Sequence, residues 1–309
     1  MNSKTSCKTI RVPASTTNLG AGFDTLGLAL QLYLKVEIGR CGAATPLVWL
    51  EGEGSNELPA DASNLICRVM QHTFLKEGVD PPGVSLRASN GIPVTRGLGS
   101  SAAAIVAGIG CFEALTGVEL SPEKFFRYAF EFEKHPDNLT AARYGGFTVS
   151  CVDEHGRVTF AKSTITPGIK ILLVVPEFQL QTEKARSVIP RTFPLADAVF
   201  NVQRSSLTVA ALLEGQFHLL RESLRDRIHQ PFRASLVPGF SEIVKLQNSE
   251  IPGLCGLCLS GAGPSILVFA ESNFAGINRA IAEILSRHRI HSRFFELEVD
   301  NQGRSISDT

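Results

Sequence analysis

The most informative stretch of this 309-residue chain runs from Gly91 to Gly108 and reads GIPVTRGLGSSAAAIVAG. Gly97 and Gly99 let the backbone turn tightly and approach a ligand closely. Ser100 and Ser101 follow, and the small residues after them predict a helix over residues 100–115. The first turn of a helix presents unpaired N–H groups that stabilise a bound anion. The stretch predicts a phosphate-binding loop, although its local features fit equally well a glycine-serine turn that caps a buried helix.

Two common nucleotide-binding motifs are missing from the chain. No Gly-Lys-Ser or Gly-Lys-Thr is present, so this is not the usual P-loop, and no GxGxxG follows a predicted strand. If the loop binds a nucleotide, a different nucleotide-binding fold is required.

Strands and helices alternate around the loop. The residue patterns predict strands at residues 9–12, 26–38, 47–51, 83–88 and 147–152, and helices at 61–75, 100–115 and 121–133, with Gly117 ending the middle helix. A turn at residues 153–156 joins two strands, and a buried strand follows at 169–175. We place a domain boundary there, which gives domains 1–166 and 167–309.

The second half is predicted to be rich in helix between residues 182 and 248. It then closes with strands at 257–259 and 266–269 around a glycine-rich turn, a helix at 274–287 and a strand at 294–299. The overall expectation is an α+β protein of two domains.

Composition limits the classes of function. Basic and acidic residues both total 30, so no net charge attracts nucleic acid, and three tyrosines and one tryptophan leave few rings to stack on bases. The polar N-terminus and the lack of a run of eighteen apolar residues predict a cytoplasmic protein. Seven scattered cysteines fit reduced thiols, and the CxxC of Cys255 and Cys258 matches no complete zinc pattern.

Five segments resemble one kinase superfamily. Pro93–Ala103, PVTRGLGSSAA, resembles the PxxxGLGSSAA loop of GHMP (galacto-, homoserine, mevalonate and phosphomevalonate) kinases, and LSGAGP at residues 259–264 resembles their C-terminal glycine-rich motif. VPASTTNLGAGFDTLGLAL at 12–30, KHPDN at 134–138 and HQPFRASLVPGF at 229–240 resemble homoserine kinases. The resemblance spans nearly the whole chain. It implies an N-terminal domain like domain 2 of ribosomal protein S5 and a C-terminal ferredoxin-like sandwich.

The resemblance implies ATP and Mg²⁺ as cofactors. The expected ATP-binding residues are Pro93, Arg96, Gly97, Leu98, Gly99, Ser100, Ser101, Ala102 and Ala103. Ser100 and Glu131 are the expected oxygen ligands of Mg²⁺, with Glu133 as the competing carboxylate. The family commonly has glycine at the position of Lys134. This difference affects how Glu131 and Glu133 align with the family's sequences.

The implied reaction is phosphorylation of the side-chain hydroxyl of L-homoserine, a step of threonine biosynthesis. Its ammonium, carboxylate and hydroxyl require both signs of charge in the pocket. The resemblance assigns substrate binding to Asn18, Asp24, His135, Asn138, Thr182, Arg186 and Arg233, and catalytic roles to Asn18, Asp24, Asn138 and Arg186. Asp24 is the expected partner of the ammonium.

Asp137 raises the question of a general base. A carboxylate that reached the acceptor hydroxyl could take its proton. Homoserine kinases are similar to mevalonate kinases but do not share a catalytic aspartate at the position of Asn138. We therefore expect direct transfer assisted by electrostatics.

Two alternatives stay open. One is a GHMP kinase for another hydroxyl acceptor, such as L-threonine, mevalonate or a sugar, and the other is a regulatory protein that binds a nucleotide without catalysis. The sequence leaves the oligomeric state open, with a homodimer formed through sheet edges as one option.

Overall fold

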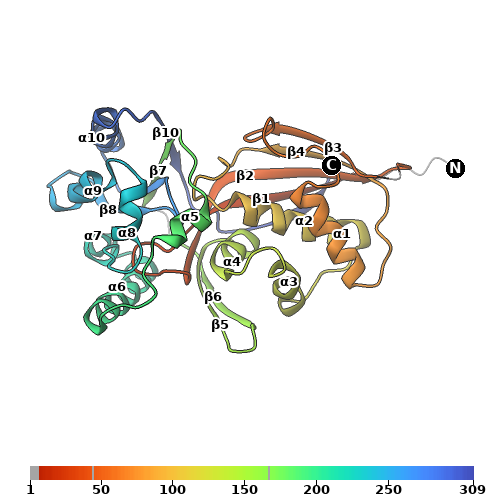
Figure 1. The fold of residues 1–309 in the computed structure, drawn as a ribbon, viewed down its shortest axis with the longest axis horizontal. Helices are drawn as coiled ribbons and strands as arrows, with labels where there is room; N and C mark the ends of the chain where they lie inside the picture. Colours follow the sequence, from red (N-terminus) through yellow and green to blue (C-terminus); the bar gives the residue numbers. More distant parts are fainter. Residues whose placement is uncertain (1–6, 44, 166–167) are drawn as a thin grey trace.

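The structure, a computed structural model, describes residues 7–43, 45–165 and 168–309. It has two parts that lie side by side along the long axis of the molecule (Figure 1). Each part is built on one β-sheet, of seven strands in the first part and four in the second, with helices packed against it. The α+β fold predicted from the sequence is confirmed.

The first sheet is organised around its longest strand. Its members are β1 (Lys8–Thr17), β2 (Leu26–Arg40), β3 (Leu47–Gly52), β4 (Val84–Asn90), β5 (Phe147–Val152), β6 (Val158–Ser163) and β11 (Ser305–Asp308). The order is β11-β1-β2-β4-β3, and β5 pairs with the first residues of β2 and with β6. From Leu34 to Ile38, β2 alternates buried and exposed residues, as expected for a strand with one face on the core.

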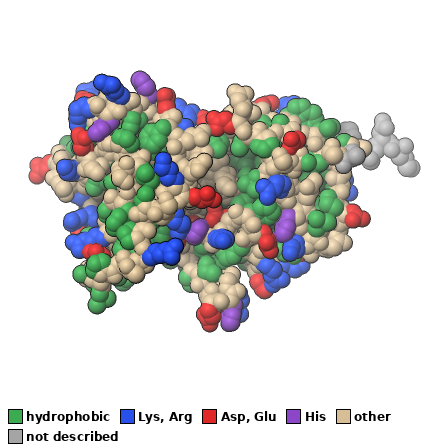
Figure 2. Space-filling model, viewed as in Figure 1, with side chains coloured by type: hydrophobic (Ala, Val, Ile, Leu, Met, Phe, Trp, Pro, Cys, Tyr) green, Lys and Arg blue, Asp and Glu red, His purple; other side chains and the backbone are tan. Residues whose placement is uncertain are grey.

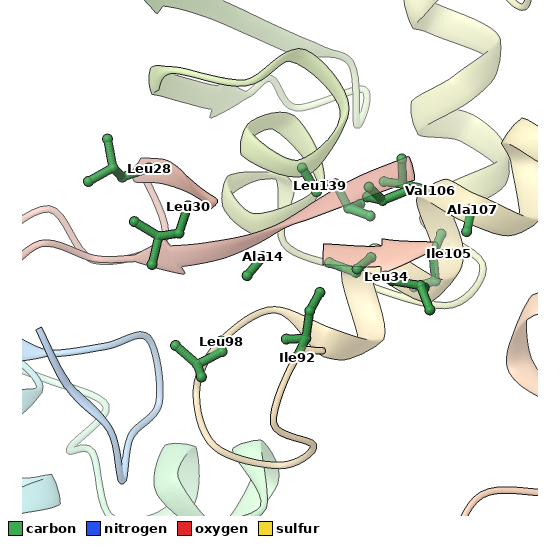
Figure 3. Close-up of a cluster of buried hydrophobic side chains, with 14 of the residues drawn as sticks. Ala14, Leu28, Leu30, Leu34, Ile92, Leu98, Ile105, Val106, Ala107 and Leu139 are labelled. Carbon is green, nitrogen blue, oxygen red and sulfur yellow. The ribbon is translucent and has the colours of Figure 1, made fainter. Parts of the chain in front are cut away.

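Helices cover one face of this sheet: α1 (Leu65–Lys76), α2 (Ser100–Thr116), α3 (Pro122–Ala129) and α4 (Pro136–Tyr144). Figure 3 shows side chains of β2, α2 and α4 gathered in the core between them. The small residues of α2 allow close packing, because a Cβ atom at Gly108 would lie 2.7 Å from Val69 Cβ. This contact holds α1 directly against α2, and α2 carries the predicted phosphate loop at its N-terminus.

The second sheet is antiparallel, in the order β10-β7-β9-β8. Its strands are β7 (Lys170–Pro176), β8 (Leu254–Leu259), β9 (Ile266–Ala270) and β10 (Ser292–Leu297). The helices of this part are α5 (Thr182–Ser187), α6 (Leu195–Leu213), α7 (Leu220–Ser223), α8 (Gln230–Arg233), α9 (Phe240–Ile243) and α10 (Phe274–Arg287), with 3₁₀ turns at Phe217–Leu219, Ala234–Leu236 and Val244–Asn248. Among the described residues, no helix combines the length and the apolar character that a membrane span requires.

Several predicted boundaries shift for local reasons. The helix predicted at 61–75 begins at Leu65, because Asn64 caps it and accepts a hydrogen bond from the Ile66 N–H at 3.0 Å. The helix predicted at 121–133 ends at Ala129, and the strand predicted at 294–299 runs two residues earlier. The helix at 274–287 and the stop at Gly117 are confirmed.

The C-terminal strand was not predicted. β11 is exposed and polar, so it has no hydrophobic pattern, yet it pairs antiparallel with β1 in the first sheet. The last residues of the chain therefore return to the first part. The predicted domain boundary between residues 166 and 167 lies outside the described residues.

Candidate active site

A cleft of about 490 Å³ lies where the two parts of the molecule meet. Its walls come from the loop before α2, the loop between β1 and β2, the start of α4, and α5, α8 and the β8–β9 turn. Figure 2 shows this face hollowed near its middle, with charged side chains along the hollow. The cleft brings together segments that lie far apart in the sequence.

The N-terminus of α2 opens into this cleft. Gly99 precedes the helix in a left-handed conformation and provides no side-chain cap, and Ser100, Ser101 and Ala102 form the first turn along the wall. The first intrahelical bond that reaches back to Gly99 comes from the Ala103 N–H. The amides of the first turn therefore face the cleft without intrahelical partners, as an anion-binding helix terminus requires.

The glycine-rich turn between β8 and β9 fixes this loop from the other part of the molecule. Ser260 Oγ donates a hydrogen bond to Gly97 O at 2.7 Å, and the Gly261 N–H donates to Thr17 O at 3.1 Å. A Cβ atom at Gly97 would lie 2.2 Å from Ser260 O, so only glycine fits there. Three of the segments that the sequence singled out thus contact one another directly.

Asp24 and Arg186 form a paired site on the opposite wall. Arg186 donates through Nη1 to Asp24 Oδ2 at 3.0 Å and through Nη2 to Asp24 Oδ1 at 2.8 Å, the two-point geometry that arginine makes with a carboxylate. The hydrogen bond to Asp24 raises the pKa of Arg186 further. Asn18 orients the pair, because its Oδ1 accepts from the Asp24 N–H at 3.0 Å. Both charges stay accessible from the cleft.

Arg233 is the most deeply buried charge that reaches the cleft, with 1% of its surface exposed. Its Nε donates to Ala185 O at 3.1 Å, and its Nη1 donates to Gly261 O at 3.1 Å. Burial, together with the neighbouring Arg186, lowers its pKa to about 10. None of the hydrogen bonds found among the described residues uses Nη2. Arg233 therefore offers a fixed, poorly hydrated cation to a ligand in the cleft.

His229 holds Arg233 in this position. Its Nδ1 lies 3.2 Å from Arg233 Nη1 and its Nε2 lies 2.7 Å from Gly20 O. Since an arginine can only donate, Nδ1 accepts and Nε2 carries the proton. Complete burial lowers the pKa of His229, so the ring is neutral.

Glu133 and His135 form a second polar pair in the cleft. His135 Nδ1 lies 2.8 Å from Glu133 Oε1, and the His135 backbone N–H donates to the same oxygen at 3.1 Å. This contact raises the pKa of His135 against the opposing effect of burial. Burial alone would raise the pKa of Glu133, but its interactions with His135 lower the pKa overall. Glu133 is therefore ionised, and no hydrogen bond among the described residues uses its Oε2.

Asp137 is buried at the first turn of α4 and lines the cleft. Burial, and next the negative charge of Asp24, raise its pKa to about 6, although the Asn138 N–H donates to its Oδ1 at 2.7 Å. The side chain of Asn138 points toward β1, where its Oδ1 accepts a hydrogen bond from Ser15 Oγ at 2.9 Å. A carboxyl group with this pKa changes its protonation near neutral pH.

Most of the site residues predicted from the sequence line this cleft. They are Asn18, Asp24, Arg96, Gly97, Leu98, Gly99, Ser100, Ser101, Ala102, His135, Asn138, Thr182, Arg186 and Arg233. The Arg96 guanidinium, however, donates to the backbone oxygens of Pro176, Val94 and Glu177, so it anchors the loop.

Three predicted residues do not line the cleft. Pro93 and Ala103 are buried behind the loop, where they pack rather than face a ligand. Glu131 is exposed and outside the cleft, because α3 ends at Ala129 and the chain turns before residue 133. The competing carboxylate, Glu133, lies in the cleft instead.

The sequence did not indicate the outer end of the cleft. An apolar wall there comes from α1, β2, β3, β4 and the loop after β3, through Leu34, Leu50, Leu58, Leu65 and Ala88, with Asn64 and Arg68 beside it. These residues are spread over five segments and form no contiguous motif, so no local signal could have found them.

The CxxC segment lies on β8 away from the cleft. Cys255 and Cys258 are buried free thiols, and burial raises the pKa of both to about 12. Neither carries the thiolate that zinc or redox chemistry needs. In the described part of the chain, no three His, Cys, Asp or Glu side chains gather into a metal-binding group.

Comparisons with known proteins identify the relatives of this chain. The model of the N-terminal domain of GHMP kinases matches residues 64–146. A homoserine kinase of Aquifex aeolicus is 45% identical over 96% of this chain and 98% of its own length, and one of Persephonella marina is 42% identical over 96% and 97%. The crystal structure of a homoserine kinase from Cytophaga hutchinsonii covers 99% of both chains with a TM-score of 0.86 and 26% identity.

The fold is that of a small-molecule kinase of the GHMP class, a class of enzymes that use ATP. Within that class, the identity over nearly the full length with curated relatives defines the family. The chain belongs to the homoserine kinases.

Proposed function

We propose that this enzyme transfers the γ-phosphoryl group of ATP to the side-chain hydroxyl of L-homoserine and forms O-phospho-L-homoserine for threonine synthesis. One observation carries the proposal: the N-terminus of α2 shares a cleft with a carboxylate and two arginines. The helix terminus suits a phosphate chain, and the opposite charges suit a small zwitterion. A neutral sugar acceptor would need no such charges.

The substrate end of the cleft matches homoserine group by group. Asp24 would accept the ammonium, and Arg233 would bind the carboxylate with Arg186 beside it. Asn18, His135, Asn138 and Thr182 surround this space and would orient the acceptor. Because protein hydrogen bonds hold all of these groups except Thr182 before substrate binds, little ordering is needed at the time of reaction.

The side chains at the phosphate end fit Mg²⁺. Ser100 Oγ takes part in no hydrogen bond found among the described residues, and both contacts of Glu133 with His135 use Oε1. A free hydroxyl and a free carboxylate oxygen are ligands that this hard cation takes. Ser100 and Glu133 would therefore hold it, and bound Mg²⁺ would neutralise charge on the transferring phosphates.

We propose direct transfer rather than general-base catalysis. The α2 amides would stabilise charge on the phosphates, and the side chains around Asp24 would align the hydroxyl with the γ-phosphorus. Asp137 is engaged with Asn138 in its own turn and would act through its charge.

The substrate assignment is tested by ADP release with Mg²⁺ and ATP against L-homoserine, L-threonine, L-serine, mevalonate and galactose. We expect turnover selective for L-homoserine. The double variant Ser100→Ala, Ser101→Ala should lose about a hundredfold or more in kcat, because it removes two hydroxyls, one of which is the proposed ligand of Mg²⁺. Preference for another acceptor would refute the substrate assignment, and ATP binding without any turnover would favour a regulatory protein.

Asp137→Asn distinguishes the two mechanisms. With direct transfer we expect kcat to stay within about tenfold of the wild type, whereas loss of a general base would cost about a thousandfold. Mg²⁺ and substrate should be saturating in both assays, and circular dichroism should show an intact fold.

The same variant has a pH-dependent effect on stability. Because the folded pKa of Asp137 is raised to about 6, its contribution to stability is fully present at low pH and is lost as pH rises through that value. Asp137→Asn removes the cost of ionising the buried carboxyl. We expect it to raise the free energy of unfolding by on the order of 2 kcal/mol at pH 8 and to change it little at pH 4. Denaturant titrations at both pH values measure this, and an equal effect at both would contradict it.

A further inference from the structure

His229 is a buried histidine that the proposed reaction does not use directly. It is completely buried and is not part of the cleft wall, whereas Arg233, four residues later, lines the cleft. A histidine usually stays partly accessible, because both of its ring nitrogens need polar partners. Here the protein itself supplies the partners, and they belong to segments that form the acceptor end of the cleft. His229 is therefore placed to act on that end through its neighbours.

The two ring nitrogens of His229 have different roles. Nδ1 lies 3.2 Å from Arg233 Nη1, and Nε2 lies 2.7 Å from Gly20 O in the loop between β1 and β2. An arginine that only donates and a carbonyl that only accepts require the tautomer with its proton on Nε2. Asp226 Oδ2, 3.5 Å from Nε2, favours a proton on the same nitrogen. The ring thus bridges the arginine of α8 and the loop that carries Asp24.

The contact with Nδ1 helps to fix the guanidinium of Arg233. Its Nε donates to Ala185 O, and its Nη1 donates both to Gly261 O and to His229. Three acceptors on two nitrogens define the plane of the group, and Nη2 is left for a ligand. Without an acceptor at His229, Nη1 keeps one partner and the plane of the guanidinium is less tightly defined. A cation that binds a carboxylate depends on this orientation.

The face of the His229 ring supports Phe23. The two rings are stacked, with their centroids 5.2 Å apart and their planes 24° from parallel. The guanidinium carbons of Arg186 and Arg233 lie over the Phe23 ring, at 5.1 Å and 5.3 Å from its centroid. Two cations held close together repel each other, and the attraction of both to one aromatic ring offsets part of that repulsion. His229 therefore supports both arginines, one directly and one through Phe23.

The turn that carries His229 is itself fixed by Asp226. The side chain of Asp226 is completely buried. Its Oδ2 accepts from the backbone N–H groups of His229 at 3.0 Å and Gln230 at 2.6 Å, and its Oδ1 accepts from Asn201 Nδ2 at 2.7 Å. Asn201 on α6 also accepts from the Arg227 N–H at 2.9 Å. The histidine is held at its backbone and at both ring nitrogens, which is the support that a preorganised binding group needs.

We propose that His229 is the positioning residue for the carboxylate of the acceptor. It orients Arg233 through Nδ1, holds the loop before Asp24 through Nε2 and supports Phe23 with its ring face. The inference rests on the proposed function, since it takes Arg233 as the group that binds the acceptor's carboxylate. His229 does not itself touch the acceptor, because it lies outside the cleft wall. Its loss is therefore expected in KM for the acceptor, and not in kcat or in KM for ATP.

Two amide substitutions separate the roles of the ring nitrogens. His229→Asn keeps an acceptor near the position of Nδ1, whereas His229→Gln places its amide near Nε2 and leaves Arg233 Nη1 without that acceptor. We expect His229→Gln to raise KM for L-homoserine about tenfold or more, with kcat and KM for ATP within about twofold of the wild type. His229→Asn should raise KM for L-homoserine about threefold or less. Steady-state kinetics measure this, and an equal or larger rise in His229→Asn overturns the proposal.

Gln247→Met is the matched control for the loss of a buried hydrogen-bonding side chain. Gln247 is 4% exposed, accepts from the Leu257 N–H at 3.3 Å and does not line the cleft. Gln247→Met should lower the thermal unfolding temperature, as His229→Gln should, but it should leave KM for L-homoserine unchanged. A rise in KM equal to that of His229→Gln would assign the effect to lost stability and overturn the proposal.

A double-mutant cycle tests whether His229 acts through Arg233. In the Arg233→Met background, His229→Gln should change kcat/KM for L-homoserine by less than about twofold, because the group that it orients is already absent. A further loss as large as in the wild-type background would show an independent role and contradict the proposal. If the double variant fails to fold, the comparison of His229→Asn with His229→Gln still decides.

The tautomer of His229 provides a test that needs neither acceptor nor nucleotide. Long-range ¹H–¹⁵N spectra of protein labelled with ¹⁵N-histidine distinguish protonated from unprotonated ring nitrogens, and the signals of His229 are those absent from His229→Gln. We expect a proton on Nε2 alone, and a proton on Nδ1 overturns the proposal. A wild type that has the expected tautomer but prefers another acceptor would refute the proposed function. KM of the two amide variants for that acceptor then decides the role of His229.

Discussion

Replacing Arg233 with methionine is expected to lower kcat/KM for L-homoserine by about a thousandfold while the affinity for ATP stays unchanged. The guanidinium is buried and its Nε and Nη1 are already bound to Ala185 and Gly261. A substrate carboxylate would bind the remaining nitrogen, Nη2, and little water would compete with it for that contact. Removing this cation leaves the carboxylate desolvated without a partner, which costs about 4 kcal/mol.

Methionine suits this test because it matches the length of the arginine stem and is itself apolar. The change leaves Ala185 O and Gly261 O without a hydrogen-bond partner, so the variant should be less stable, and circular dichroism should show an intact fold before the kinetics are compared. Arg233→Lys should recover part of the activity, since it restores the charge without the planar fork that also bonds Ala185 O and Gly261 O. Arg279→Gln on α10, exposed and remote from the cleft, is the control. Equal losses of ATP and homoserine affinity in Arg233→Met would indicate a collapsed cleft and would contradict the assigned role.

Local motifs and distant contacts differ in how far the sequence reveals them. The loop before α2 was predicted because its glycines and serines are contiguous and their conformational roles are local. Helix α10 was predicted to the residue because its apolar side chains repeat with the helical period over four turns. β11 was missed because its pairing with β1 spans almost the whole chain and leaves no hydrophobic pattern.

The candidate site divides in the same way. Asp24 and Arg186 belong to separate short motifs, and their two-point contact follows from the meeting of the β1–β2 loop with α5, which no spacing predicts. The choice between Glu131 and Glu133 depended on where α3 ends, and helix ends are poorly defined by sequence. The sequence also did not predict which charged side chains are buried. Desolvation and the negative charge of Asp24 raise the pKa of Asp137, and both depend on the folded structure.

Gly99→Ala should lower kcat by at least about a hundredfold and should weaken ATP binding in parallel. Gly99 has a φ of 67°, in the left-handed region that costs other residues about 1 kcal/mol. The larger effect is steric. A Cβ atom at this position would lie 2.0 Å from Ser15 Oγ and 2.8 Å from Asn138 Oδ1, so the start of α2 must move away from Ser15 on β1 and Asn138 on α4. A shift of about 1 Å at a reacting group is enough to lose two orders of magnitude.

The same helix provides a matched control at its other end. Gly117 ends α2 with a φ of 74°, and no atom lies within 4 Å of the Cβ position there. Gly117→Ala therefore has the same backbone cost as Gly99→Ala without the collision. It should lower the free energy of unfolding by about 1 kcal/mol and leave kcat and ATP affinity unchanged. Titration calorimetry of both variants with ATP separates two effects on phosphate binding. One is the steric collision at residue 99, and the other is the loss of a glycine in the left-handed conformation. Equal ATP affinities in Gly99→Ala and Gly117→Ala would show that phosphate binding does not depend on the close approach of Ser15 and Asn138 to the start of α2.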